Sequence, residues 1–130
     1  MKMRKRVPDK AQARSLILAS EQEMIYLDTL TPTVEGASTI IRGIYENFRR
    51  LGEALLLLQG WEGDHEDSIQ ALTALQVKTN RPIYVLDNLR RLRHDINYMG
   101  YQPSADDLAD VLSIKKECWK PVLEEVKKRV

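Results

Sequence analysis

The sequence predicts an all-α protein, an up-and-down bundle of four long helices with one short extra helix. Apolar residues recur three and four positions apart along most of the chain, which is the spacing of one helical face. The alternation of apolar and polar residues that marks a strand persists nowhere. Turn-forming residues separate the periodic segments. We therefore expect residues 1–130 to form one helical domain around a single core.

The first two helices are expected over residues 8–30 and 34–59. A Thr-Pro-Thr segment separates them, and Thr33 is suited to cap the second helix. Gly60 is suited to end it, because glycine adopts the left-handed cap conformation without strain. The apolar residues of the second helix alternate by three and four, which favours packing along a neighbouring helix. They are Ile41, Ile44, Phe48, Leu51, Leu55 and Leu58.

Opposite charges four residues apart lie on the outer face of the second helix. Such pairs stabilise a helix by only about 0.2–0.5 kcal/mol each. We interpret them as a solvated surface that serves solubility. The pairs are Arg42 with Glu46, Glu46 with Arg50, and Arg49 with Glu53.

Three further helices complete the predicted bundle. A short one is expected over 64–76, and a turn at 80–82 leads into a fourth over 82–100. Ser104 is suited to cap the fifth helix. Pro121 lacks the backbone donor that a helix interior needs, so we expect an interruption with a kink close to Trp119.

Composition limits the classes of protein to consider. With 43% hydrophobic and 30% charged residues, the chain falls in the range of globular proteins. It has 20 Lys and Arg against 19 Asp and Glu, so net charge alone does not indicate nucleic acid. Residues 1–7 form a basic tail that we expect to be flexible. Cys118 is the only cysteine, which favours the cytoplasm, and no apolar run approaches the ~20 residues of a membrane span.

The fourth helix carries two stripes of opposite character. The apolar stripe, which belongs in a core, consists of Val85, Leu89, Leu92, Ile96 and Met99. The polar stripe consists of Arg90, Arg93, His94, Asn97 and Tyr101. Guanidinium groups offer fixed forks of donors for phosphate, and the rings of Tyr98 and Tyr101 can stack on bases. The polar stripe is therefore a candidate binding site for an anionic ligand.

The polar stripe also has a purely structural interpretation. Arg90 can pair with Asp87 or with acids of a neighbouring helix. Asn97 can cap the end of a kinked helix. Both interpretations remain open on the local pattern alone.

Ile83 and Leu86 give the first half of the fourth helix apolar residues on two sides. A helix that packs on one core needs only one apolar side. This surplus predicts self-association through the fourth helix.

No metal or cofactor is expected. His65 and His94 are the only histidines, and neither forms a recognised zinc spacing with another ligand. The acidic residues around His65 suit the start of a helix, since they oppose the positive end of its dipole. The chain also lacks the glycine-rich loop followed by Lys and Ser or Thr that holds phosphates.

Two blocks of the sequence resemble the HEPN superfamily, the higher-eukaryote and prokaryote nucleotide-binding helical domain. IYENFRRLGEALLLLQGWEGDHEDSIQAL, at 44–72, is similar to the long second helix of the family, its glycine and the start of a short helix. LRRLRHDINYMGY, at 89–101, is similar to the signature helix of the family. In active members, an arginine and a later histidine form a metal-independent ribonuclease site, and two copies meet across a dimer cleft.

This resemblance implies roles for residues of the fourth helix. Arg93 takes the position of the motif arginine, and Tyr98 stands where the histidine is expected. His94 has no arginine at the motif spacing before it. A phenol, with a usual pKa of about 10, is a poorer base at neutral pH than an imidazole, at about 6.5. The resemblance also implies a homodimer, and a minimal nucleotidyltransferase as partner and antitoxin.

Three interpretations follow. The first is a HEPN-like dimer that binds RNA or a nucleotide in a cleft, without the ribonuclease histidine; the cleft is lined by Arg90, Arg93, Asn97 and Tyr98. The second is a ribonuclease toxin in which Arg93 stabilises the scissile phosphate and His94 or Tyr98 acts as acid or base. The third is a non-catalytic scaffold in which the polar stripe is a protein interface.

Overall fold

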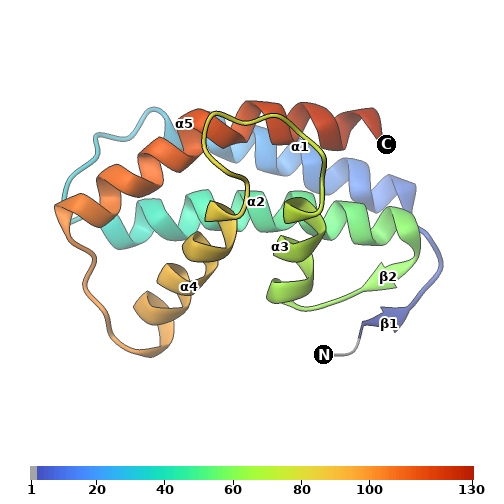
Figure 1. The fold of residues 1–130 in the computed structure, drawn as a ribbon, viewed down its shortest axis with the longest axis horizontal. Helices are drawn as coiled ribbons and strands as arrows, with labels where there is room; N and C mark the ends of the chain where they lie inside the picture. Colours follow the sequence, from blue (N-terminus) through green and yellow to red (C-terminus); the bar gives the residue numbers. More distant parts are fainter. Residues whose placement is uncertain (1–2) are drawn as a thin grey trace.

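The helices predicted from the sequence are present, with shifted ends. A computed structural model describes residues 3–130, and this part of the chain contains five helices and two short strands (Figure 1). The helices are α1 (Lys10–Leu27), α2 (Ala37–Gln59), α3 (His65–Thr73), α4 (Val85–Tyr98) and α5 (Ala105–Lys128), and the strands are β1 (Arg4–Lys5) and β2 (Trp61–Glu62). The all-α prediction is confirmed apart from the strands, which the sequence did not predict.

Local hydrogen bonds set where α1 and α2 begin. The carboxylate of Asp9 accepts a hydrogen bond from the backbone N–H of Gln12 at 2.9 Å, so α1 begins after Asp9 rather than at residue 8. The hydroxyl of Thr33 accepts from the backbone N–H of Gly36, which forms a turn before the helix. Helix α2 therefore begins at Ala37 and not at residue 34.

Two cap predictions are confirmed. The predicted interruption of α5 at Pro121 is wrong, and the kink expected close to Trp119 stays a prediction. Gly60 has a φ of 81°, in the left-handed region, and ends α2. Ser104 and Asp107 form a reciprocal pair of side-chain to backbone hydrogen bonds at the start of α5. Helix α5 continues through Pro121, because Cys118 and Val122 on either side are buried and anchor it in the core.

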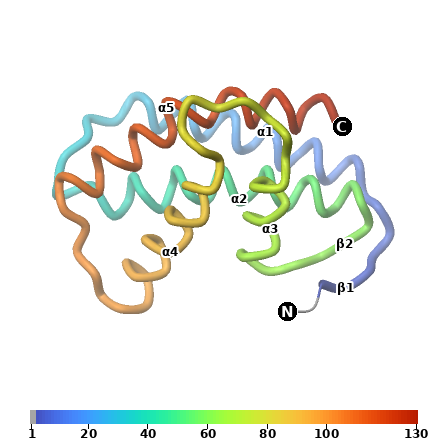
Figure 2. Tube along the Cα trace, viewed as in Figure 1, coloured from blue at the N-terminus to red at the C-terminus, as the bar shows by residue number. Residues whose placement is uncertain are grey.

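The central element of the fold is α2, and each of the other four helices packs against it. In the view of Figure 1, α1 and α5 lie above α2, and α3 and α4 lie below it. The segment 74–84 between α3 and α4 rises across α2 to reach α5, as Figure 2 also shows. There Nη1 of Arg81 donates to Oδ1 of Asp110 at 2.9 Å. The segment 64–98 is thus attached to the upper layer as well as to α2.

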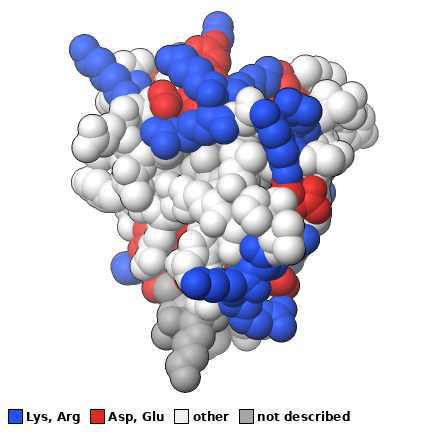
Figure 3. Space-filling model, turned by 90° about the vertical axis from the view of Figure 1, so that its right-hand side faces the viewer, with Lys and Arg blue, Asp and Glu red and all other residues white. Residues whose placement is uncertain are grey.

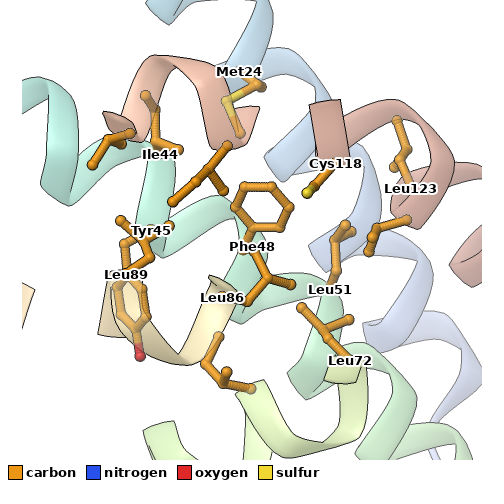
Figure 4. Packing of buried hydrophobic residues seen from close by; sticks show 14 of the residues in the cluster. Met24, Ile44, Tyr45, Phe48, Leu51, Leu72, Leu86, Leu89, Cys118 and Leu123 are labelled. Atoms are coloured by element: carbon orange, nitrogen blue, oxygen red, sulfur yellow. The ribbon is translucent and has the colours of Figure 1, made fainter. Parts of the chain in front are cut away.

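The buried side chains form one continuous cluster around α2 (Figure 4). Phe48 is fully buried, and its ring meets the ring of Trp119 edge-on, with 5.1 Å between centroids. Five members of the predicted apolar stripe of α2 are buried, and Leu58 is half-buried. All five helices contribute residues to this cluster, and loss of a ring such as that of Phe48 would cost about 3–5 kcal/mol.

The prediction of a second apolar surface on α4 is wrong. Leu86 is fully buried in the core, and Ile83 is half-buried against it. Helix α4 contacts α2, α3 and α5, so apolar residues on two of its sides are covered within one chain. Met99, which was expected in the core, is 71% exposed because α4 ends before it. The argument for a dimer through α4 therefore loses its apolar support.

The expected flexible tail is in part a small ribbon. Strand β1 pairs antiparallel with β2, with Arg4 opposite Glu62 and Lys5 opposite Trp61. Arg4 and Glu62 also form an ion pair at 2.9 Å. Residues 1 and 2 lie outside the described residues.

Charges of both signs are mixed on the end of the bundle where α5 finishes. Figure 3 shows Lys and Arg in two groups on this face, with uncharged residues between them and acids nearby. This face therefore offers no continuous basic track. No helix within residues 3–130 combines the length and the apolar character needed to cross a membrane.

Candidate anion-binding site

The centre of the candidate site is Tyr45, which α2 places against α3 and α4. Its side chain is fully buried beside Leu89, and its hydroxyl points away from the apolar cluster (Figure 4). That hydroxyl lies 3.0 Å from Nδ1 of His65, the first residue of α3. The two rings are nearly parallel, with 5.7 Å between centroids. Tyr45 therefore connects the core to a polar cluster at the start of α3.

Two local features fix His65 in this position. Asp64 and Asp67 form a capping box at the start of α3, as the acidic cluster there predicted. Gly52 of α2 lets α3 approach closely, since a Cβ at this position would lie 1.9 Å from the carbonyl oxygen of Ser68. The backbone of α3 is therefore in direct contact with α2.

Arg93 of α4 lies beside Tyr45 in the same cluster. Its guanidinium carbon lies 5.5 Å from the centre of the Tyr45 ring and 5.9 Å from that of Tyr98. The side chain of Arg93 is half-buried. No carboxylate or other hydrogen-bond acceptor within residues 3–130 receives its N–H groups. Arg93 is thus a half-buried cation between two aromatic rings, and its N–H donors have no hydrogen-bond acceptor among the described residues.

The other two arginines near Tyr45 are paired. Arg49 donates twice to Glu46, from Nε to Oε1 at 2.9 Å and from Nη2 to Oε2 at 2.7 Å. Arg90 donates from Nε to Oδ1 of Asp87 at 2.9 Å, which is the structural alternative that the sequence left open. Arg49, Arg90 and Arg93 all act electrostatically on the phenol of Tyr45.

The pKa values of the cluster follow from burial and from these charges. Burial raises the pKa of Tyr45 to about 12, although the charges of Arg93, Arg49 and Arg90 oppose the rise. Burial lowers the pKa of His65, and the charges of Arg49 and Arg93 lower it further. Burial opposes ionisation of Glu46, but the hydrogen bond and charge of Arg49 outweigh it and lower the pKa of that carboxyl. At neutral pH the cluster therefore holds a neutral phenol and a neutral imidazole among charged groups.

The remaining residues of the polar stripe take different positions. Asn97 accepts a hydrogen bond from Nε of Arg42, so it links α4 to α2 and does not cap the helix end. Arg42 therefore does not pair with Glu46 as the sequence predicted. The ring of His94 is exposed and lies 5.0 Å from that of Tyr98.

Tyr101 lies beyond the end of α4 and outside this cluster. Its hydroxyl donates to Oδ2 of Asp107 at the start of α5. A shallow surface hollow lies along α4 and is lined by Arg90, Arg91, His94 and Asp95. The structure thus brings Arg93, His94 and Tyr98 together and separates Tyr101 from them.

Sequence reasoning found Arg93 but missed Tyr45, His65 and the Glu46–Arg49 pair. The spacing of four residues predicts only that Glu46 and Arg49 belong to other pairs on a solvated surface, and the acids around His65 predict only a helix start. A tyrosine inside the most regular apolar helix was the available signal, because a buried phenol requires a polar partner. The partner, His65, is 20 residues away, and no local pattern identifies it.

The fold and site together define an all-α protein with a cationic cluster between α2, α3 and α4. No group of three His, Cys, Asp or Glu side chains that could hold a metal ion occurs in the described part of the chain. No protein-family model matches this chain, and no curated protein or solved structure matches it. The resemblance of residues 44–72 and 89–101 to HEPN domains therefore remains an expectation from the sequence.

Proposed function

We propose that this chain is a HEPN-like helical protein that binds a phosphate group of RNA or of a nucleotide at Arg93. The observation that carries the proposal is the half-buried guanidinium of Arg93, whose donors have no acceptor within residues 3–130. A buried charge without a partner is costly, and a phosphate matches the donor fork of arginine. Binding of a phosphate at Arg93 would offset the free-energy cost of leaving its charge without an acceptor.

The local charge balance supports an anion. Arg49 is paired with Glu46 and Glu53, and Arg90 is paired with Asp87, whereas Arg93 has no carboxylate partner among the described residues. The positive charge available to an anion therefore belongs to Arg93. Partial burial strengthens its attraction for an anion compared with a fully solvated side chain.

The rings beside Arg93 support a nucleotide or RNA rather than a simple anion. Tyr98 is 68% exposed and lies next to both Arg93 and the ring of His94. Exposed aromatic rings beside a cation are the usual means of holding an unpaired base next to its phosphate. Arg93 and Tyr98 would then contact the phosphate and the base of one nucleotide.

The test is the binding of a fluorescent single-stranded RNA, followed by anisotropy. Arg93→Ala should weaken binding by about tenfold or more, since a hydrogen bond to a charged group contributes about 1.5–3 kcal/mol. Arg91→Ala is the matched control, because Arg91 lies on the same helix and its side chain is 70% exposed. Equal losses for both variants would indicate a diffuse charge effect and contradict the proposal. Unchanged binding by Arg93→Ala would favour the scaffold interpretation.

One observation favours a second candidate function, a metal-independent ribonuclease. His65 supplies an imidazole at the cluster, beside Tyr45 and within the electrostatic influence of Arg93, although Tyr98 occupies the motif position. Cleavage of RNA by the wild type that both His65→Ala and Arg93→Ala abolish would establish this activity. RNA left intact by the wild type would remove it. A nucleotidyltransferase partner belongs to the same proposal and is tested by co-purification from cells. A cytoplasmic location also belongs to it and is tested by fractionation of those cells.

A further inference from the structure

Helix α1 carries apolar residues on both of its faces. The inward face packs on α2 through Ala13, Ile17 and Met24, which are 0–5% exposed. The outward face carries three large apolar side chains that the described residues leave in solvent. They are Leu18, Ile25 and Tyr26, which are 56%, 65% and 62% exposed. A second apolar face therefore exists on α1, not on α4 where the sequence predicted it.

The charges of α1 run against its helix dipole. Lys10 and Arg14 lie near the N-terminus, and α1 has neither an acidic residue in its first turn nor a basic one in its last. Acidic groups near the N-terminus and basic groups near the C-terminus would stabilise an isolated helix. Neither Lys10 nor Arg14 has an ion-pair partner within residues 3–130. The order of charges is thus unfavourable for α1 alone.

The acidic side of α1 lies along a groove between α1 and α5. Glu21 binds Nζ of Lys127 at 2.7 Å, and Asp28 pairs with Lys115. The groove contains two hollows that share Glu21. One is lined by Arg14, Ile17, Leu18, Glu21, Lys127 and Val130. The other is lined by Glu21, Met24, Ile25, Asp28, Trp119, Lys120 and Leu123.

We propose that the outward face of α1 is the interface between two copies of this chain, with the two α1 helices antiparallel. Arg14, Glu21 and Asp28 are seven residues apart and lie on one flank of the Leu18 and Ile25 row. A two-fold axis near Glu21 brings Arg14 of each copy next to Asp28 of the other. Arg14, which has no ion-pair partner among the described residues, thereby gains an acidic neighbour in Asp28 of the other copy, beside the Lys115 with which that Asp28 already pairs.

The apolar side chains fit the same arrangement. In an antiparallel pair, Leu18 of one copy lies over the hollow beside Ile25 of the other, and Ile25 lies over the hollow beside Leu18. Each exposed side chain thus has a hollow to enter, and the two contacts are equivalent by symmetry. This self-complementarity is what a two-fold interface requires.

This interface is independent of the proposed function. Helices α1 and α4 lie on opposite sides of α2 (Figure 1), so a dimer through α1 leaves Arg93 and Tyr98 accessible in both copies. A failure of RNA binding would not affect the dimer, and a monomeric protein would not affect RNA binding.

The first test is the mass in solution by light scattering at micromolar concentrations. The wild type should give about twice the 15.0 kDa of one chain, and the double variant Leu18→Glu, Ile25→Glu should give 15.0 kDa. Tyr84→Glu, at an exposed residue before α4, is the matched control and should remain dimeric. Circular dichroism verifies that all variants stay helical. A monomeric wild type, or a dimeric double variant, overturns the proposal.

The second test examines the antiparallel arrangement. Arg14→Asp should weaken the dimer and Arg14→Lys should retain it, because only the second variant keeps a cation opposite Asp28 of the other copy. Gln22→Cys lies near the proposed axis and should be cross-linked to its copy by a short bismaleimide, while the natural Cys118 is buried. Cross-linking of Tyr98→Cys instead would place the interface on α4 and overturn the proposal.

Discussion

The guanidinium of Arg93 lies over the ring of Tyr45, with 5.5 Å between the guanidinium carbon and the ring centre. This contact joins α4 to α2 at the point where the Tyr45 hydroxyl meets His65 of α3. Cation–π contacts of this kind contribute about 0.5–2 kcal/mol, depending on how far water is excluded. Packing of the three helices and the position of the Arg93 guanidinium are therefore coupled, and substitutions here should change both stability and the proposed binding.

Replacement of Tyr45 by Phe should destabilise the fold by about 0.5–1.5 kcal/mol, because Nδ1 of His65 loses its hydrogen-bond partner while the ring contact with Arg93 remains. Urea unfolding measures the change. Tyr26→Phe is the control, since Tyr26 is 62% exposed and its side chain has no hydrogen bond within the described residues. An equal effect of the two substitutions would show that the hydrogen bond does not contribute.

The stability of the protein should fall as the pH decreases below about 6.5, the usual pKa of an unfolded histidine. Burial lowers the pKa of His65 in the folded state, so the unfolded chain binds the proton more tightly. The contribution of His65 to the free energy of unfolding is complete above the pKa that it has in the unfolded chain. That contribution is lost as the pH falls toward its lower pKa in the folded state. Urea midpoints at pH 7.5 and pH 5.5 should differ less in His65→Gln than in the wild type or in His94→Gln. A pH dependence that His65→Gln leaves unchanged would contradict this assignment.

Replacement of Glu46 by Gln should strengthen the binding of RNA while lowering stability. The carboxylate of Glu46 binds Arg49 through two hydrogen bonds, whereas a Gln amide is uncharged and has one acceptor oxygen, so more of the Arg49 charge becomes available to an anion. Loss of the carboxylate charge and of one hydrogen bond should cost about 1.5–3 kcal/mol of folding free energy. Anisotropy and urea unfolding measure the two effects. Glu53→Gln is the comparison, because Glu53 makes only a 3.5 Å contact with Arg49. Weaker binding by Glu46→Gln would rule out an anion at this cluster.

Replacement of Gly52 by Ala should destabilise the protein by about 1–3 kcal/mol, because the new Cβ would overlap the backbone of α3 at Ser68. The same change should weaken RNA binding, since α3 carries His65. Gly43→Ala is the matched control on α2. Its Cβ would lie 3.0 Å from Cδ1 of Leu27, a movable side-chain atom, so the cost should be small. Similar melting temperatures for the two variants would argue against the close α2–α3 contact.

Much of the fold could be predicted because it depends on local signals. The spacing of apolar residues in α2, the left-handed Gly60 and the Ser104 cap each act within a few neighbouring residues. The position of Arg93 on the polar face of α4 followed from helical periodicity in the same way. The predicted ends of α1 and the predicted start of α2 were wrong, because short turns competed with the terminal helical residues.

The rest of the site depends on contacts between distant segments. Tyr45 and His65 meet because α3 packs on α2. The spacing of apolar residues within either helix does not predict that contact. Leu86 was assigned to an outer surface because a helical pattern shows how many sides are apolar but not how many neighbours cover them. The β1–β2 ribbon was missed because two residues on each strand are too few to form a pattern.

The attachment of segment 64–98 to the rest of the chain has an evolutionary consequence. Both His65 and Arg93 belong to this one continuous stretch, which lies between α2 and α5 in the sequence (Figure 2). Helices α1, α2 and α5 supply only Tyr45 and the Glu46–Arg49 pair. Under the proposed function, sequence changes confined to this stretch would alter ligand preference while α1, α2 and α5 keep their sequence.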